Sequence, residues 1–469
     1  FEHDGSVKPV GSAQALGGVM LSGYEPAGMV PLGGARTAYL FRGKNDWRVV
    51  LWDNHLRDPK AELSSFDPNW TPGEVRNLLK ELGETKRYYN QMSLFTLRLP
   101  KGATVLDVMT NPMSMPEQNG EVTVALTASP VYMTFPGLDE EAVRDVFRQS
   151  KVVNIGFDDI EIMPLVGRDP KTGQSALVLN VINNTHGEVS ANLAISKLKG
   201  ARLQADKQAG AAPGYANEFM FFPFAKDGLK SGEITGSYNI EIKGRKPITG
   251  EFLKRIVTAR RMAKAPKIDG DLSDWDLKKR GSVEMDTSYM GEKACAKEDI
   301  SAQAWFGWDA ENFYAAVKVL DDKYFPAWDA PSGFWNQDSV EFFFDFDVLG
   351  DAMDADMSFD DLQVLTVAGT KDNPDQPAVG PAESFPGMRI GSARFKGGYI
   401  IEYSFPIKTM PTVKAESGTV LGLDFGIDDA DAPRKGDGKP YRKLQMQWST
   451  RDWGIWKTPS KYGMVVFAD

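Results

Sequence analysis

The sequence predicts an all-β protein built from three tandem β-sandwich domains. Short runs carry an apolar residue at every second position and are bounded by Gly, Pro, Asn or Asp, which is typical of strands separated by turns. Helical and strand segments do not alternate along the chain, which argues against an α/β architecture. The length of 469 residues suits about three domains of roughly 100–200 residues each.

The first predicted domain covers residues 1–136. Residues 37–43 and 47–53 form two alternating runs with a short Gly- and Asp-containing turn between them, a pattern that predicts a hairpin. A helix is expected near residues 67–84, because Thr71 is a suitable N-cap and Pro72 suits the first helical position. A short helix is expected at 8–20, and further strands at 93–100, 104–112 and 121–136.

The second predicted domain covers residues 137–260 and the third covers 261–469. Residues 137–150 are charged and predict a helical connector, and the strand spacing that follows fits a small immunoglobulin-like sandwich. The third domain opens at "APKIDGDLSDWD" and is expected to have strands at 300–309, 312–322, 339–347, 362–369, 398–406, 419–429, 443–449 and 462–469.

Composition limits the classes of partner. The net charge is −10, and residues 263–469 hold 23 Lys and Arg against 35 Asp and Glu. An acidic surface repels phosphate backbones, so nucleic acid is not expected as a partner. No run approaches the ~18 apolar residues of a membrane span. Cys295 is the single cysteine, so no internal disulfide framework is expected.

The chain begins at Phe1 without a charged and then apolar leader. We therefore expect that any signal peptide has been removed or lies further upstream. The predicted location is secreted or cell-surface, in the extracellular space or periplasm of a bacterium.

Residues 334–347, "FWNQDSVEFFFDFD", pose a specific question. Val340, Phe342 and Phe344 fall on one face, which predicts a strand with one face on a core and the other face free. This pattern does not explain Trp335, a large ring beside Asn336 in the expected loop before the strand. Eight of the eleven tryptophans lie after position 270, which indicates that recognition takes place in the last domain.

The third domain resembles the family 9 carbohydrate-binding modules. The resemblance rests on landmarks in order: "IDGDLSDW", "AWFGWDAENFYAAVKVLDD", "WNQDSVEFFFD", "GYIIEYSFP" and the closing tryptophan, proline and "YG". It implies a β-sandwich that holds a sugar, often a chain end, between two tryptophans, with bound calcium.

Under this resemblance, Trp335, Gln337 and Glu341 are the first candidate sugar-binding residues. A planar ring covers the apolar C–H face of a sugar, and amide and carboxylate groups bind its hydroxyls. A straight strand would separate Trp335 from Glu341 by about 20 Å, so the chain must bend near Asn336 for them to share a ligand. The alternative is that Trp335 covers an edge of the sandwich.

The second wall of the sugar site has three candidates. Trp453 lies in a loop beside Arg451, while Trp448 shares a strand face with Met446 and can equally be a core residue. Trp456 is the third candidate. Arg389 is a candidate hydroxyl donor, with a surface strand arginine as the alternative.

Calcium is the expected cofactor, in a structural role. Asp269, Asp271 and Asp274 lie close together in "DGDLSDWD" and are the candidate ligands, because calcium takes six to eight oxygen ligands. Residues 345–361 hold seven aspartates and form a second acidic segment, and a solvated acidic loop is the alternative for both. The three histidines have no zinc spacing, and a haem site in the last domain would need Met or Lys ligands.

The first domain resembles the β-domain that packs behind the barrel of many glycoside hydrolases, on "KPVGSAQAL", "AYLFRGKNDWRVVLWD", "ATVLDVMTNPM" and "SPVYM". No barrel is recognised, and with it no pair of catalytic carboxylates. We therefore predict the non-catalytic, carbohydrate-binding portion of a secreted polysaccharide-active protein. Its partners would be a polysaccharide or oligosaccharide and a catalytic domain, either upstream or on a separate chain. The alternatives are a structural or assembly protein of the cell surface and a complete enzyme with an unrecognised active site.

Overall fold

A computed structural model of the chain describes most of the predicted strands. The expected helix at 67–84 lies outside the described residues, while residues 16–21 are helical and overlap the helix expected at 8–20. The described residues are 16–32, 36–53, 92–126, 130–155, 158–185, 187–214, 216–279, 282–285, 299–325, 331–350, 352, 357, 360–370, 372–373, 375–380, 385–432, 441–449 and 458–469.

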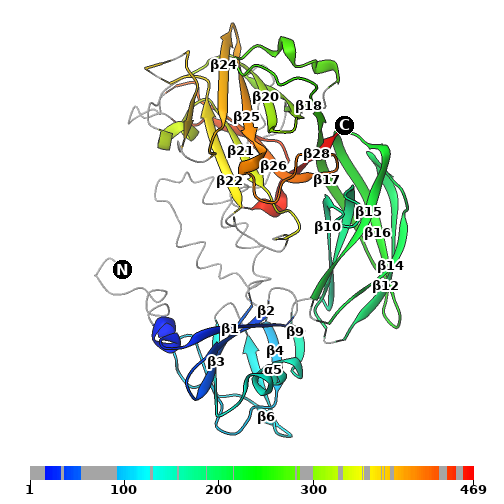
Figure 1. The fold of residues 1–469 in the computed structure, drawn as a ribbon, viewed down its shortest axis with the longest axis vertical. Coiled ribbons are helices and arrows are strands. Elements are labelled where there is room, and N and C mark those ends of the chain that lie inside the picture. The colour runs from blue at the N-terminus through cyan, green and yellow to red at the C-terminus, as the bar shows by residue number, and fades with distance from the viewer. Residues whose placement is uncertain are drawn as a thin grey trace. The chain divides into compact units, whose positions relative to one another are not determined.

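The architecture is all-β, as predicted (Figure 1). The expected helical connector is confirmed as α5 (Glu140–Arg148). Asp139 caps this helix by accepting a hydrogen bond from the Ala142 amide at 2.8 Å, and Val143 and Phe147 are its buried residues. Within the described part of the chain, no helix has the length and apolar character needed to cross a membrane.

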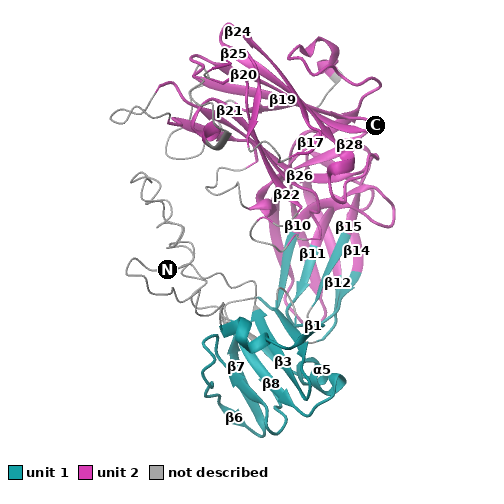
Figure 2. Cartoon of the chain, turned by 60° about the vertical axis from the view of Figure 1, so that its left-hand side comes forward, with its two compact units in different colours: residues 1–163, 180–191, 210–220 teal, residues 164–179, 192–209, 221–469 magenta. Residues whose placement is uncertain are grey.

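The chain divides into two compact units (Figure 2). The first unit holds residues 1–163, 180–191 and 210–220, and the second holds 164–179, 192–209 and 221–469. The division runs through the predicted middle domain, so the proposed limits at 136 and 260 stay predictions.

The first unit contains two antiparallel sheets around one apolar core. Trp47, Phe95 and Phe135 are among the buried core residues, and Phe147 of α5 meets Phe135 edge-on at 5.8 Å between ring centroids. One sheet has the order β1 (Glu25–Pro31), β2 (Arg36–Arg42), β3 (Asp46–Asp53), β8 (Val131–Pro136), β5 (Thr104–Leu106), and the other the order β6 (Glu117–Gln118), β7 (Glu121–Leu126), β4 (Met92–Leu97), β9 (Lys151–Ile155).

The strands that follow belong to two further groups. One sheet has the order β10 (Ile160–Arg168), β11 (Ser175–Asn183), β15 (Ala216–Leu229), β13 (Ala201–Leu203). In the other group, β12 (Val189–Lys199) pairs with β14 (Lys207–Ala212) and with β16 (Gly232–Ile242), which pairs with β17 (Ile248–Arg261).

The C-terminal region is a sandwich of two layers. Its strands form one hydrogen-bonded path that turns back on itself, so that Phe306 meets Phe425 at 6.0 Å and Phe342 meets Phe405 at 5.9 Å between ring centroids. The path has the order β23 (Ala378–Gly380), β22 (Asp361–Val367), β21 (Ser339–Asp345), β26 (Val420–Asp429), β28 (Gly463–Ala468), β17, β19 (Ile300–Trp308), β20 (Asn312–Asp321), β25 (Gly398–Pro406), β24 (Arg389–Phe395), with β18 (Ser282–Met285) on β19 and β27 (Leu444–Gln447) on β26.

Strand β17 connects the two layers of this sandwich. It pairs in parallel with β28 from Ile256 to Arg260, and Arg260 and Arg261 pair in parallel with β19. Val257 and Ala259 belong to the same buried cluster as Phe467 of β28. The C-terminal sandwich therefore includes a strand that precedes residue 261.

The prediction that β21 has one free face is wrong. All seven of its residues are buried, including Ser339, Glu341 and Asp345 on the face turned away from the main core. The preceding turn η3 (Pro331–Asn336) and the distant η6 (Pro459–Lys461) pack against β21, and the Phe343 ring lies 6.1 Å from that of Tyr462. This polar face therefore carries buried carboxyl groups, which alternation alone does not reveal.

Candidate functional site

Trp335 lies on η3, the turn that leads into β21. Its neighbour Phe334 is fully buried and packs with Leu365 and Val367, whereas Trp335 is 45% exposed. Phe334 is therefore the core residue of this turn, and Trp335 lies at the surface. The guanidinium carbon of Arg442 lies 5.7 Å from the centre of the Trp335 ring, within the range of a cation–π contact.

A set of buried residues, which we name the polar floor, lies on the outer face of β21, β26 and β27. Strand register places its members in two adjacent rows, and residues that face each other across a ladder have Cβ atoms about 5 Å apart. The first row is Ser339, Asp428 and Gln445, and the second is Glu341, Gly426 and Gln447.

Arg442 links the polar floor to Trp335. It donates a hydrogen bond to Asp428 Oδ1 at 2.9 Å, and the Ser339 hydroxyl donates to Asp428 Oδ2 at 2.7 Å. Asp428 is fully buried and Arg442 is only 19% exposed, so this ion pair is protected from solvent. Because solvent does not compete for this ion pair, it holds the Arg442 guanidinium beside the Trp335 ring.

Glu341 and Asp428 share a hydrogen bond between their carboxyl groups. Burial raises the pKa of Glu341 well above its usual range, and the negative charge of Asp428 raises it further. Burial also raises the pKa of Asp428, but the Arg442 guanidinium acts in the opposite direction. The proton therefore resides on Glu341, which presents a neutral carboxylic acid, while Asp428 is the charged partner of Arg442.

Gln447 extends the polar floor beside Glu341. Its amide is 1% exposed, and neither of its polar atoms has a hydrogen-bond partner among the residues that the structure describes. Gly426 makes room for it, because a Cβ at that position would lie 2.8 Å from Gln447 Nε2. Gln445 instead donates to Glu341 Oε2 at 3.2 Å.

The structure places some of the predicted sugar-binding residues around η3 and β21 and another in the apolar core. Gln337 is fully buried two residues after Trp335, and Glu341 is 3% exposed in β21. Glu341 is linked to Trp335 through Asp428 and Arg442. Trp448 belongs to the apolar core, where its ring lies 5.8 Å from that of Phe425. Trp453 and Trp456 lie outside the described residues.

Arg389 is placed apart from this group. It begins β24, at the opposite end of the strand path from β21, and its guanidinium donates to the Ser404 hydroxyl at 3.5 Å. Asp428, Arg442 and Gln447 were not predicted from the sequence. Only Gln447 has a local signal, because Gln445 and Gln447 share a strand face in "QMQWS".

The predicted calcium ligands serve the turn that contains them. Asp269 accepts the Asp271 amide at 3.1 Å, Asp271 accepts the amide and hydroxyl of Ser273 at 3.0 Å, and Asp274 accepts the Lys267 amide at 2.9 Å. The buried Glu402 holds the segment by accepting the Trp275 indole N–H at 2.5 Å. A metal at these three residues stays a prediction.

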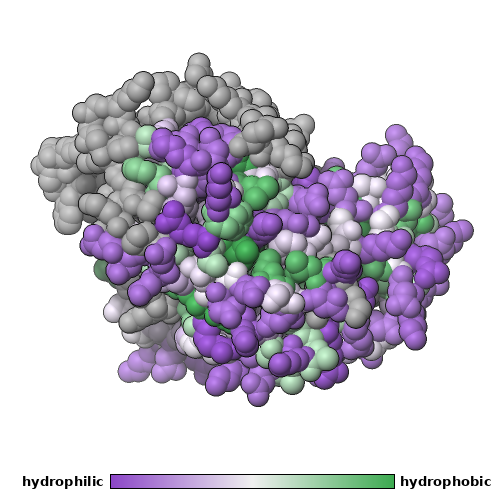
Figure 3. Space-filling model, turned by 90° about the horizontal axis from the view of Figure 1, so that it is seen from above, coloured by the Kyte–Doolittle hydropathy of each residue, from purple (hydrophilic) through white to green (hydrophobic). Residues whose placement is uncertain are grey.

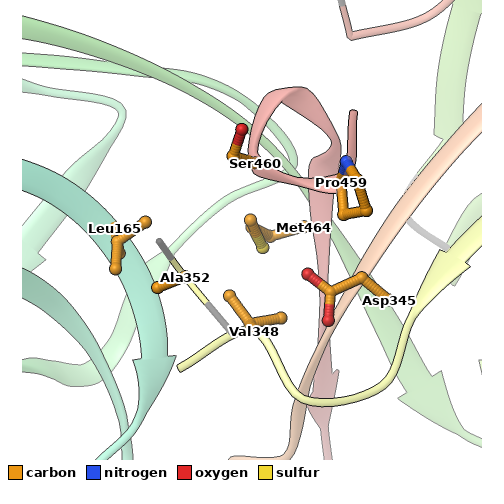
Figure 4. Close-up of a pocket in the computed structure, with 7 residues that line it drawn as sticks. All are labelled: Leu165, Asp345, Val348, Ala352, Pro459, Ser460 and Met464. Carbon is orange, nitrogen blue, oxygen red and sulfur yellow. The ribbon is translucent and has the colours of Figure 1, made fainter. Parts of the chain in front are cut away.

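A small pocket lies at the other end of β21 (Figure 4). The Asp345 carboxyl group faces it among mostly apolar neighbours, including Val348 and Met464. It has room for about one water molecule, which is too small for a sugar ring.

Viewed from above, the described surface is mainly hydrophilic, with hydrophobic residues gathered near its middle (Figure 3).

Comparison with known families confirms the resemblance of the C-terminal region. Residues 268–469 match the family described as "Carbohydrate family 9 binding domain-like". This match supports carbohydrate binding by that region. No curated protein matches the chain.

Solved structures with similarity to this chain include a family 9 carbohydrate-binding module from Caldicellulosiruptor kristjanssonii in complex with cellotriose. It is 20% identical with a TM-score of 0.35, and the match covers 46% of this chain and 94% of that one. A family 9 module from the same organism in complex with glucose is 19% identical with a TM-score of 0.36, and that match covers 45% of this chain and 95% of the other.

Proposed function

We propose that residues 268–469 bind a sugar ring of a polysaccharide or oligosaccharide against Trp335. The observation that carries the proposal is the contrast within η3, where a buried Phe334 fixes the turn and leaves Trp335 45% exposed. An aromatic ring already held in place loses little conformational freedom when a ligand stacks on it. Its apolar face suits the C–H face of a sugar.

The polar floor provides the hydrogen-bonding side of the proposed site. Arg442 lies beside the Trp335 ring, and its ion pair with Asp428 orients its donors. Glu341, as a neutral acid whose proton is shared with Asp428, keeps carboxyl oxygen lone pairs that can accept a hydrogen bond from a sugar hydroxyl. We propose Trp453 as the second wall. Trp448 is not proposed, because its ring is part of the core.

The wider proposal is that this chain is a non-catalytic part of a secreted polysaccharide-active protein. It is supported by the family match at residues 268–469. A first domain of the kind that accompanies glycoside hydrolase barrels is part of the same proposal. The catalytic domain would lie upstream or on a separate chain. A bacterial extracellular or periplasmic location belongs to the same proposal.

A glycan array probed with the full chain tests the proposed function. The array would carry neutral sugars, including glucose and cellotriose, and insoluble polysaccharides, and the chain should be retained on one class of glycan. Isothermal titration with a soluble member of that class should then give saturable binding. Absence of binding to every glycan, together with self-association of the chain, would support a structural or assembly protein of the cell surface instead.

A further inference from the structure

Cations are concentrated in one part of the second compact unit. Residues 192–209 and 221–261 together hold 13 Lys and Arg against 5 Asp and Glu, a net charge of +8. The whole chain carries −10, so the remaining residues carry −18. A region of opposite sign in an acidic protein is a surface that attracts negatively charged partners.

Two connections between strands bring several of these cations together. β12 ends at Lys199 and β13 begins at Ala201, while β15 ends at Leu229 and β16 begins at Gly232. Ala201 pairs with Leu229, so the two connections lie side by side. Gly200, between β12 and β13, has a φ of +80° and packs against the Glu233 backbone so closely that a side chain would not fit. The backbone of this region is therefore fixed by its neighbours.

Five exposed cations lie in these segments, and we name them the basic surface: Lys197, Lys199, Arg202, Lys226 and Lys230. Asp227 is the one acid in residues 197–203 and 225–231. No member of the basic surface forms an ion pair with a carboxylate in the part of the chain that the structure describes. Their charges are therefore available to an external anion.

Other cations of the same unit are already paired. Arg255 Nη2 lies 3.0 Å from Glu233 Oε1, and Arg168 Nη2 lies 2.5 Å from Glu416 Oε2. Glu233, the acid whose backbone adjoins Gly200, is thus engaged with Arg255 and does not neutralise the basic surface.

Arg202 provides a donor of defined position within the basic surface. Its Nη2 donates a hydrogen bond to the Lys226 carbonyl at 3.0 Å, which holds the guanidinium between the two segments. Its other N–H groups have no acceptor among the described residues. A planar guanidinium can offer two parallel N–H donors to a carboxylate or a sulfate group.

We propose that the basic surface binds a linear polysaccharide that carries anionic groups, either the carboxylates of uronic acids or sulfate esters. Separate cations on two adjoining connections suit a flexible chain whose charges occur at intervals. The choice of a polysaccharide among polyanions rests on the proposed function. The site itself is distinct from Trp335, because its residues belong to β12, β13, β15 and the connection to β16, whereas Trp335 lies on η3.

Two other classes of anionic partner fit less well. Binding to a lipid surface combines cations with exposed apolar side chains, and residues 197–203 and 225–231 contain no exposed large hydrophobic residue. Duplex DNA is stiff over about 50 nm, so it would also meet the repulsion of the acidic residues outside the basic surface.

Affinity electrophoresis of the full chain tests the proposal. The gels would contain polygalacturonate, dextran sulfate or dextran, the uncharged backbone of dextran sulfate. At about 0.1 M salt, at least one anionic polymer should retard the chain more than dextran does, and which one identifies the anionic group as carboxylate or sulfate. The extra retardation should disappear at about 1 M salt, because the Debye length falls from about 10 Å to about 3 Å.

The double variant Lys199→Glu with Lys230→Glu should bind that polymer about tenfold more weakly, because two attractive contacts become repulsive. Both side chains are exposed, so its melting temperature should match that of the native chain. Lys243→Glu with Lys246→Glu is the matched control. It changes the net charge equally, but it lies beyond the far end of β16, about 30 Å away along the strand, and should bind as the native chain does.

The proposal is overturned if neither anionic polymer retards the native chain more than dextran, or if both double variants lose affinity equally. Tighter binding of the native chain to anionic phospholipid vesicles or to duplex DNA would also overturn it. Trp335→Ala should keep its retardation by the anionic polymer. Failure of the proposed function would appear separately, as unchanged binding of the neutral glycan by that variant.

Discussion

Neighbouring aromatic residues in η3 have opposite roles. Phe334 is fully buried among Leu365 and Val367, whereas Trp335 is 45% exposed. Phe334→Ala should lower the free energy of unfolding by about 3–5 kcal/mol, because it leaves a cavity in the core. Trp335→Ala should change it by less than about 1 kcal/mol, in line with surface substitutions. Urea unfolding of the two variants checks this, and equal losses would show that Trp335 is a core residue.

The proton assigned to Glu341 leads to a second prediction. Gln is close in shape to a protonated Glu, so Glu341→Gln should preserve both the fold and sugar affinity within a few-fold at pH 7. Glu341→Leu has similar volume but removes the acceptor of the Gln445 amide and one hydrogen bond to Asp428. It should therefore weaken the binding of the glycan found on the array about tenfold, measured by isothermal titration. A tenfold loss in Glu341→Gln would show instead that Glu341 binds as a carboxylate.

Asp424 gives the C-terminal sandwich a pH-dependent stability. Burial raises the pKa of this β26 carboxyl group from 3.8 to about 7, despite hydrogen bonds from the Ser449 hydroxyl at 2.6 Å and the Phe425 amide at 2.7 Å. At a pH between 3.8 and about 7, Asp424 loses its proton in the unfolded chain and keeps it in the folded chain. The contribution of Asp424 to stability therefore falls as pH rises from about 4 to about 7, and is constant above.

Asp424→Asn tests this sign, because the amide does not titrate and can imitate the protonated acid. The difference in free energy of unfolding, variant minus native chain, should therefore increase as pH rises to 8. The increase should be at most about 1.4 kcal/mol for each unit by which the pKa of Asp424 is raised. Urea unfolding at pH 5 and pH 8 measures the difference. A variant whose relative stability is lowest at pH 8 would contradict the assigned protonation state.

At the scale of elements, β17 determines how the C-terminal sandwich closes. Its pairing with β28 from Ile256 to Arg260 lies within the same apolar core as Phe467. A protease site inserted after the exposed Lys264 would cut the chain between β17 and the rest of that sandwich. The two pieces should stay together under native conditions, because five pairs of residues and the buried Val257 and Ala259 hold them.

Size-exclusion chromatography of the cut protein should therefore give one peak at the elution volume of the uncut chain. A denaturing gel should show two bands. Separation of the pieces without denaturant would show that the domain predicted from residue 261 is independent of β17.

Across the whole molecule, periodicity in the sequence identified the strands well. The runs at 300–309, 312–322 and 339–347 correspond to β19, β20 and β21, because a period of two survives wherever one face meets a core. Periodicity does not say which strands become neighbours. The position of β17 between β28 and β19, and the cover over the polar face of β21, depend on contacts between distant segments.

In the candidate site, local sequence patterns predict some residues, whereas others join the site only through strand pairing. Trp335 and Glu341 were recognisable because an aromatic in a polar segment and an acid in an apolar strand each break a local pattern. Asp428 and Arg442 break no such pattern, and only strand pairing brings them to Ser339 and Trp335. Asp321, Asp338 and Asp429 are likewise separated in sequence, and only the fold brings one carboxylate oxygen of each within 4.8 Å of the other two.

The central claim is that Trp335 stacks on a sugar. Its most direct test is isothermal titration of Trp335→Ala with the glycan that the array identifies, beside Trp52→Ala, in which an equally exposed tryptophan of β3 is removed. Loss of a stacking contact worth about 1–2 kcal/mol should weaken binding by Trp335→Ala about tenfold. Trp52→Ala should bind as the native chain does. Unchanged affinity in Trp335→Ala would contradict the account, and the sugar site would then have to be sought elsewhere in the C-terminal region.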